Sequence, residues 1–457
     1  MFSIEDDLFI KSSSIENKMF IFALSSINKE EVMERETIRK IIIEGQEFIG
    51  EVPLVERRFS FEESGNYVFV GIRQAGKSYL LYQRIQQLVR EGHSMEEMVY
   101  INFDDERLRQ MTANDFDLIL QAYATMFDLR PIFFFDEIQN IEGWENFARR
   151  LANQKYRVYI TGSNAKMLSR EIATTLGGRF WNANVYPYSF SEYLKAMDVS
   201  LSKNWRYGKQ SAEVSKLFNS YFMYGGFPEL VGVVAKRMWL NDIYRKIFFS
   251  DLVVRNKVRN EEALGLLVKR LAEGVKQPVS HTRLANLISS AGIKLSKATV
   301  IDFIRYLKES CLIFPLENYA AKFAERNSNM KYYFIDNGLL NIFLTDVNTT
   351  LLENMVAIHL YKQFGEQVYF YNQNIEVDFF IPEHKTGFQV SYSLKDENTY
   401  HREVEALIKL NAVFQLEHMY IITRDEEQTI VHDSGVVIEV LPIWKWLLAE
   451  TEMIENS

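Results

Sequence analysis

The chain has 457 residues, 47% of them hydrophobic and 25% charged, which excludes general disorder and provides for roughly two to four folded domains. Its formal net charge of −9 excludes a surface that is basic throughout, but it leaves room for a local basic patch. The single cysteine excludes a disulfide framework and a cysteine-based metal site. The first residues lack the pattern of a signal peptide, and no uncharged apolar run reaches the about 18 residues of a membrane helix, so we expect a soluble cytoplasmic protein without a membrane partner.

Residues 1–60 are charged and mixed in character, and we expect a helical N-terminal segment there. From residue 61 onward, short apolar runs alternate with helical segments. The runs that we expect to be strands are residues 67–70, 99–103, 132–135 and 158–160. This alternation is typical of a parallel sheet covered by helices on both faces. The pattern therefore predicts an α/β core over residues 61–187.

The loop after the first strand fits the phosphate-binding pattern G-x-x-x-x-G-K-[ST] at every fixed position. Glycines let successive backbone N–H groups turn toward an anion, and the next helix adds the positive end of its dipole. We expect Lys77 to reach the β- and γ-phosphates of ATP and the Ser78 hydroxyl to bind Mg²⁺. A glycine-rich turn that binds nothing is the alternative. The predicted nucleotide-contacting residues are Gly71, Ile72, Arg73, Gln74, Ala75, Gly76, Lys77, Ser78 and Tyr79.

Two acids, Asp136 and Glu137, end the strand predicted at residues 132–135. A carboxylate at the end of a buried strand is costly unless it faces a cation or water. We therefore expect Asp136 to complete the Mg²⁺ site and Glu137 to polarise the attacking water, which favours hydrolysis over binding alone. The alternative is a strand that ends in two solvated acids.

Small polar residues end the next strand, and we expect Ser163 to lie beside the γ-phosphate, with capping of the following helix as the alternative. Arg179 follows two glycines. It is a candidate for stabilising charge on the transferred phosphate, either within one chain or across a subunit boundary in a homo-oligomer. An ordinary surface salt bridge is the alternative role for Arg179.

Residues 188–260 are mostly helical by pattern, and residues 261–316 read as three helices and a strand. The second and third of these helices open at Ser280 and Ser296, which are good N-cap residues. Between residues 269 and 308 there are eight Lys/Arg residues and two acids, a local basic excess. A helix-turn-helix that contacts DNA is therefore one interpretation. A unit that packs against protein is the other. The candidate phosphate contacts are Lys294, Lys297 and Arg305.

Residues 317–450 again alternate strands with helical segments and predict a second α/β unit. The runs that we expect to be strands are residues 332–335, 368–371, 377–381, 388–392 and 419–423.

Motifs of one family are spread over most of the chain beyond about residue 35. They are residues 70–78, 100–108, 136–139 with Trp144, 161–163, 178–179, 186–194, 225–228, 334–340, 353–356 and 376–379. Together they resemble a family of prokaryotic AAA-type ATPases with a C-terminal nuclease-like domain of the PD-(D/E)XK type. The resemblance implies a helical lid over residues 188–260, a winged-helix unit over residues 261–316 and a nuclease-like domain over residues 317–450. It also favours a finger-like role for Arg179.

A nuclease of that type needs a carboxylate pair for Mg²⁺ and a lysine near the attacking water. Glu353 and Asp378 supply carboxylates, but Gln389-Val390-Ser391 stands where Glu-x-Lys is expected. Glutamine cannot neutralise a divalent cation and serine cannot replace an ammonium group. Lys395 lies four residues further on, but we do not expect it to replace the missing lysine. We therefore expect a retained fold without cleavage, in which Glu353, Glu376 and Asp378 are structural or binding residues.

The leading hypothesis is an ATP-hydrolysing molecular switch that uses Mg²⁺ and transmits its nucleotide state to an unidentified protein partner. Two alternatives remain. One is an ATP-regulated nuclease that cuts DNA, and the other is a DNA-binding regulator in which ATP serves only to change shape.

Overall fold

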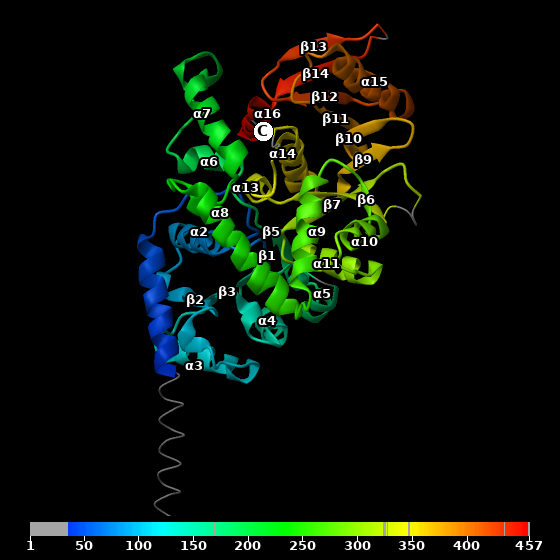
Figure 1. Cartoon of the computed structure of the whole chain (residues 1–457). Helices are drawn as coiled ribbons and strands as arrows, with labels where there is room; N and C mark the ends of the chain where they lie inside the picture. Colours follow the sequence, from blue (N-terminus) through cyan, green and yellow to red (C-terminus); the bar gives the residue numbers. More distant parts are fainter. Residues whose placement is uncertain are drawn as a thin grey trace, which may run out of the picture.

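The computed structural model describes residues 35–168, 170–322, 326, 328–345, 348–433 and 435–455. Of the predicted N-terminal segment, residues 1–34 lie outside the described residues, and residues 35–51 are helical. The N-terminal core and the C-terminal sheet lie at opposite ends of the molecule, with helices between them (Figure 1). None of the helices in the described ranges has the length and apolarity needed to cross a membrane.

The core is a five-stranded sheet in which every described strand pair is parallel. The strand order is β2-β3-β4-β1-β5. The predicted parallel α/β core is therefore confirmed, and four of its strands lie where the apolar runs placed them. The fifth was not predicted, because its sequence is Trp-Asn-Ala-Asn and three of its four residues are exposed. The strands are β1 (Tyr67–Val70), β2 (Met98–Asn102), β3 (Ile132–Asp136), β4 (Val158–Gly162) and β5 (Trp181–Asn184).

Helices cover both faces of this sheet, and alternate residues of one strand enter different hydrophobic clusters. Tyr67 and Phe69 of β1 pack in the cluster that contains helix α2, whereas Val68 and Val70 pack in the cluster that contains α4. This explains why the strand is apolar at every position. The helices of the core are α2 (Lys77–Arg90), α3 (Phe116–Ala124), α4 (Trp144–Asn153) and α5 (Arg170–Leu176).

The next segment is helical, as the pattern predicted. Helix α8 (Lys236–Lys246) runs without a break into a π-helical stretch, Ile247–Val254. π-Helices are rare and are found mostly as local insertions at functional sites. The earlier helices of this segment are α6 (Phe190–Ala196) and α7 (Lys209–Tyr224).

The remaining strands form one nine-stranded sheet of order β13-β14-β12-β11-β10-β9-β7-β8-β6. The predicted domain boundary between residues 316 and 317 falls inside β7, which pairs with β8 on one side and β9 on the other. The two predicted C-terminal units therefore share a sheet. The strands are β6 (Val279–Ser280), β7 (Ile313–Asn318), β8 (Asn329–Phe334), β9 (Tyr369–Asn372), β10 (Glu376–Ile381), β11 (Thr386–Val390), β12 (His418–Thr423), β13 (Gln428–Val431) and β14 (Val437–Pro442).

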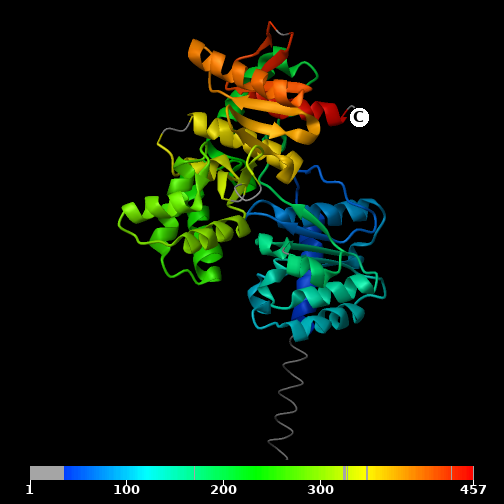
Figure 2. The same ribbon diagram turned by 90° about the vertical axis from the view of Figure 1, so that its right-hand side faces the viewer.

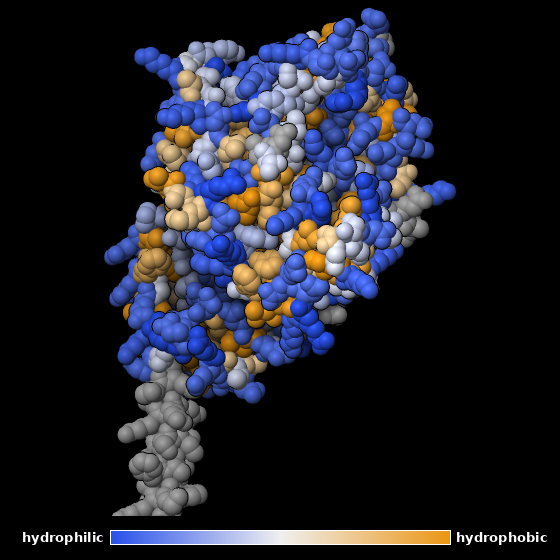
Figure 3. Space-filling view, viewed as in Figure 1, coloured by the Kyte–Doolittle hydropathy of each residue, from blue (hydrophilic) through white to orange (hydrophobic). Residues whose placement is uncertain are grey.

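Helices α9, α10 and α11 lie beside the core, as the second view shows (Figure 2). The face seen in Figure 3 is largely hydrophilic, with hydrophobic residues scattered over it. The helices of the C-terminal half are α9 (Glu261–Glu273), α10 (His281–Ser290), α11 (Lys297–Glu309), α13 (Asn337–Asn341), α14 (Asn348–Phe364), α15 (Glu397–Phe414) and α16 (Ile443–Glu455).

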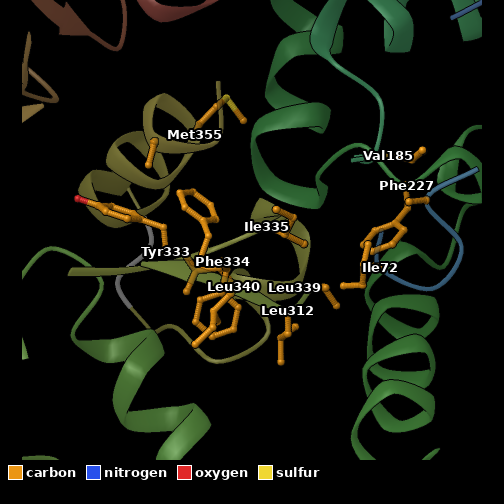
Figure 4. Packing of buried hydrophobic residues seen from close by; sticks show 14 of the residues in the cluster. Ile72, Val185, Phe227, Leu312, Tyr333, Phe334, Ile335, Leu339, Leu340 and Met355 are labelled. Carbon is orange, nitrogen blue, oxygen red and sulfur yellow. The ribbon is translucent and has the colours of Figure 1, made fainter. Parts of the chain in front are cut away.

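A continuous hydrophobic cluster joins the core to the C-terminal sheet. It contains Ile72 of the loop after β1, Phe227 of the glycine-rich turn at residues 225–228, and Phe334 and Leu340 of the C-terminal half (Figure 4). Asp336 adds polar contacts at this junction, because its carboxylate accepts hydrogen bonds from the backbone N–H groups of Gly226 and of the first turn of α13. The glycine-rich turn is thereby fixed to the C-terminal half.

Candidate phosphate-binding site

A cleft of about 590 Å³ opens at the carboxyl ends of the core strands. The loop after β1, the ends of β2 and β3, the turn at residues 228–229 and the end of α8 line it. The lining residues are Val55, Arg57, Arg73, Gln74, Gly76, Lys77, Ser78, Tyr79, Tyr82, Asn102, Asp104, Asp136, Glu137, Tyr188, Pro228, Glu229 and Lys246. The volume lies within the range of ordinary small-molecule sites.

The fixed glycines of the loop are required by its geometry. A Cβ atom on Gly71 would lie 2.0 Å from the backbone oxygen of Val185, so a side chain there would push β5 away. Gly76 has a φ of 92°, in the left-handed region that favours glycine. Lys77 directly follows it as the first residue of α2, so the N–H groups at that helix end face the cleft. The loop is thus shaped to receive an anion.

Lys77 is buried and bonded within the site. Its ammonium group donates to the backbone oxygens of Gly71 and Ile72, at 3.1 and 3.2 Å, and to the Ser163 hydroxyl at 2.8 Å. The same ammonium lies 3.6 Å from the Glu137 carboxylate. The structure therefore brings together three of the predicted residues, Lys77, Ser163 and Glu137.

Asp136 is almost completely buried at the end of β3. It accepts hydrogen bonds from the hydroxyls of Thr161 and Tyr100, the latter at 2.8 Å, and is bonded to Ser78. Burial and the charge of Glu137 raise the pKa of Asp136, and these hydrogen bonds offset only part of that effect. A cation beside this carboxylate would relieve the cost of burying its charge.

Glu137 has a left-handed backbone, with φ of 51° and ψ of 39°, which is uncommon for a residue other than glycine. Its N–H donates to Thr161, and its carboxylate accepts from Ser163 at 2.6 Å and from Gln139. Burial acts to raise the pKa of Glu137, but the charge of Lys77 and these hydrogen bonds outweigh it, so the pKa is lowered. Glu137 is therefore ionised at neutral pH.

The donor atoms in the cleft fit Mg²⁺. The Ser78 hydroxyl and the Asp136 carboxylate are hard oxygen ligands, and a hydrogen bond already joins them. Within the described ranges, no group of three or more His, Cys, Asp or Glu side chains is arranged to hold a metal.

Arg179 precedes β5 and lies at the amino ends of the core strands, whereas Lys77 follows β1 and lies at their carboxyl ends. Its backbone oxygen accepts from the side chain of Asn66, which directly precedes β1, whereas the phosphate-binding loop follows β1. Its guanidinium group donates to the backbone oxygen of Gly177. The structure does not bring Arg179 to the cleft of its own chain, so of the alternatives left open for it a surface role and action across a subunit boundary remain. Action across a subunit boundary stays a prediction.

A second polar cluster, in the C-terminal sheet, was only partly predicted. Lys331 of β8 is fully buried, and its ammonium lies 3.5 Å from Glu353, 3.2 Å from Glu376 and 3.5 Å from Asp378. Gln389 is bonded to the β10 backbone, accepting from the N–H of Asp378 and donating to the oxygen of Glu376. The missed residue was Lys331, and the available clue was a charged residue inside an apolar strand.

Burial raises the pKa of Asp378 to about 7, and the neighbouring Glu353 adds to the shift, while Lys331 opposes it. Burial acts to lower the pKa of Lys331, but the charges of Glu353, Asp378 and Glu376 outweigh it, so the pKa is raised. Lys331 therefore stays charged among the acids. Lys395, the other lysine considered for this place, is exposed.

A model of the AAA domain family matches residues 64–194, and a model of a domain of unknown function matches residues 215–350. An uncharacterized protein of Methanocaldococcus jannaschii is 32% identical over 427 residues, which cover 90% of this chain and 94% of that protein. An uncharacterized protein of Haemophilus influenzae is 31% identical over 304 residues, 65% of this chain and 74% of that one.

Among solved structures, the chain is similar to the Walker-type ATPase of Pyrococcus abyssi, with 14% identity, a TM-score of 0.39, and coverage of 65% of this chain and 99% of that one. It is also similar to the ORC1 protein of Aeropyrum pernix in complex with DNA, with 13% identity, a TM-score of 0.29, and coverage of 71% and 93%.

The match to the AAA domain family supports the AAA part of the resemblance, and the parallel five-stranded core agrees with it. The nuclease-like part of the resemblance has no such support, because the family model that matches residues 215–350 is a domain of unknown function. The chain belongs to the same family as the Methanocaldococcus jannaschii protein, and its residues 64–194 form an AAA domain.

Proposed function

We propose that this protein is a Mg²⁺-dependent ATPase that acts as a nucleotide-driven switch. The observation that carries the proposal is a single cleft lined both by Lys77 and Ser78 at the start of α2 and by Asp136 and Glu137 at the end of β3 and directly after it. This arrangement provides a cradle for phosphate, oxygen ligands for a cation and an ionised carboxylate for water.

Binding of a triphosphate is favoured by the present partners of Lys77. They are two neutral backbone oxygens and a hydroxyl, with one carboxylate at 3.6 Å. Phosphate oxygens are charged and form stronger bonds with an ammonium group than neutral acceptors do. Ser78 and Asp136 would hold Mg²⁺, which neutralises charge on the β- and γ-phosphates when it is bound.

Hydrolysis is assigned to Glu137, which would orient and polarise the attacking water. Ser163 positions this carboxylate, because its hydroxyl accepts from Lys77 and donates to Glu137. If Lys77 moved toward phosphate, the Ser163 hydroxyl would lose the hydrogen bond that it accepts from Lys77. We propose that Ser163 links occupation of the phosphate site to the placing of the base.

The proposal is tested by calorimetric titration of ATP in the presence of Mg²⁺, with wild-type protein and the Lys77→Ala variant. We expect wild-type protein to bind with a dissociation constant in the micromolar range and the variant to bind at least about tenfold more weakly, since a charged hydrogen bond is lost. Wild-type protein that binds no ATP at millimolar concentration would exclude the proposed function.

The C-terminal half would transmit the nucleotide state to a partner, and DNA is the second candidate for that partner. The order α9, β6, α10, α11, β7, β8, with β8 antiparallel to both β6 and β7, supports a winged-helix unit. Lys294 and Lys297 are exposed at its surface. Arg305, in contrast, pairs with Asp302 at 2.9 Å and Glu309 at 3.7 Å, which reduces its value as a phosphate contact.

Fluorescence anisotropy with a labelled DNA duplex, at low and moderate salt, distinguishes a DNA partner from a protein partner. DNA binding predicts an affinity that falls with salt and is weakened when Lys294 and Lys297 are replaced by alanine. If the protein does not bind the duplex, or if its affinity for the duplex changes neither with salt nor with these substitutions, a protein partner remains the candidate. DNA cleavage is not proposed, because Lys331 lies among the acids where a nuclease of this type would hold its cation.

A further inference from the structure

Arg73 connects the phosphate-binding loop to the helical segment that follows it. Its side chain makes two hydrogen bonds to Asp251, one from Nε to Oδ2 and one from Nη2 to Oδ1, each 3.1 Å long. Asp251 is 3% exposed and belongs to the π-helical stretch after α8. Arg255, one turn further, donates to the same carboxylate at 2.9 Å.

Arg73 lies between the two fixed glycines of the loop and lines the cleft. Its side chain therefore starts from the backbone that wraps the phosphates. The charges of Glu137 and Asp104, which line the same cleft, help to raise the pKa of Arg73. A guanidinium group in this place can reach either a carboxylate behind the loop or a phosphate in front of it.

Arg57 and Lys77, two other basic residues of the cleft, are less suited to this role. Arg57 is held by Glu192 through two hydrogen bonds and also donates to the backbone oxygens of Ala75 and Tyr186. Lys77 already serves as the lysine of the loop. Arg179 lies at the other end of the core strands. Arg73 differs from Arg57, the other arginine that lines the cleft, because both of its described side-chain hydrogen bonds go to one carboxylate, that of Asp251.

We propose that Arg73 senses the γ-phosphate: when ATP binds, its guanidinium group exchanges the Asp251 carboxylate for phosphate oxygens. The inference rests on the proposed nucleotide binding and adds the residue that distinguishes ATP from ADP. Guanidinium binds carboxylate and phosphate with the same two-pronged geometry, so the exchange replaces one strong pair by another.

The π-helical stretch gives this exchange a structural consequence. After Arg73 leaves, Asp251 keeps Arg255 as its only described ion-pair partner, four residues away on the same helix. A buried carboxylate that loses a cation is costly, so the stretch must rearrange or take up another partner. Phe248 of this stretch packs against Gly265 of α9, and Tyr244 of α8 packs edge-on against Phe343. A shift of the stretch would therefore move side chains that contact the C-terminal half.

The test compares the affinities for a slowly hydrolysed ATP analogue and for ADP, measured by calorimetry with Mg²⁺. We expect Arg73→Ala to weaken analogue binding about tenfold to hundredfold and ADP binding less than about threefold, because one charged pair to the γ-phosphate is lost. Asp251→Asn is expected to tighten analogue binding, since it removes the competing anion. Arg73→Lys keeps the charge without the two-pronged geometry and should lose part of the discrimination.

The matched control is Arg245→Ala on α8, whose exposed side chain lies 3.9 Å from Asp242. It should bind both nucleotides as wild-type protein does. Hydrogen exchange of residues 247–258 is the second readout. Wild-type protein and the control should differ in exchange there between analogue and ADP, and Arg73→Ala should not.

Equal weakening of both nucleotides in Arg73→Ala, or no weakening of either, overturns this inference alone. Wild-type protein that binds neither nucleotide overturns the proposed function and the inference together. Because Arg73 is partly exposed, its alanine variant is expected to fold, and thermal melting checks this.

Discussion

The Ser163 hydroxyl lies 2.6 Å from the Glu137 carboxylate, to which it donates while it accepts from Lys77 at 2.8 Å. A phosphate-binding lysine and the proposed base for water are thus joined through one hydroxyl group. The base also has a strained backbone, which fixes the direction of its side chain.

Replacing Glu137 by glutamine is expected to abolish turnover while ATP binding is retained. The amide keeps the shape and the contacts to Ser163 but cannot act as a base, so we expect phosphate release to slow by about a hundredfold to ten-thousandfold. The Glu142→Gln variant, at an exposed position nearby, is the control. Turnover in Glu137→Gln within about threefold of wild type would assign the base elsewhere.

Arg179 is expected to act across a subunit boundary, which a mixing experiment can detect. Lys77→Ala and Arg179→Ala should each show little ATP turnover alone. Mixed, they should regain part of the wild-type rate, because some interfaces then join an intact loop to an intact arginine. Arg179→Ala with full activity, together with wild-type protein that stays monomeric with an ATP analogue, would assign Arg179 to the surface.

Removing the charge of Lys331 is expected to destabilise the C-terminal sheet strongly. Lys331→Met leaves three carboxylates without their cation, and breaking a buried pair of this kind costs about 3–5 kcal/mol of unfolding free energy. Chemical denaturation measures this loss, and the exposed Lys395→Met is the matched control.

Asp378 is expected to make stability depend on pH between about 4 and 7. Its pKa is raised to about 7 in the folded protein, from an ordinary value near 3.8, so folding favours the protonated form. The contribution is fully present below pH about 4 and is lost as pH rises through 7. Asp336 and Glu403, each with a pKa raised to about 6, act in the same direction.

The measurement is the melting temperature of wild-type protein and Asp378→Asn at pH values from 5 to 8. Subtracting the two curves removes the contribution of Asp336, whereas the contribution of Glu403 changes in the variant because the charge of Asp378 helps to raise the pKa of Glu403. The variant should lose less stability than wild type as the pH rises. Parallel curves would mean that Asp378 is ionised throughout the range.

The sequence predicts local features well where chemistry repeats along the chain. The loop from Gly71 to Ser78 and the strands β1 to β4 were predicted from spacing and apolar runs, because these strands are buried on both faces. Strand β5 was missed since it is mostly exposed and therefore lacks that pattern. Its place is fixed by pairing with β1, a contact between distant segments.

Other parts of the site depend on contacts that no local pattern contains. Arg73 and Asp251 are 178 residues apart, and Lys331 meets Asp378 from a different strand. The position of Arg179 relative to Lys77 is set by the parallel direction of β1 and β5. Such relations depend on tertiary structure. Arg73, Arg179 and Asp378 were singled out from the sequence, whereas their partners Asp251 and Lys331 were not.

The hydrophobic cluster that runs from Ile72 to Leu340 has a consequence for how the chain can be divided. Cutting at residue 260 or 316 would expose apolar surface on both fragments, and the second cut would also split β7. The fragments are therefore expected to aggregate rather than fold alone, and the intact chain to melt in a single cooperative transition across both sheets. Expression of the isolated AAA domain would require a redesigned surface.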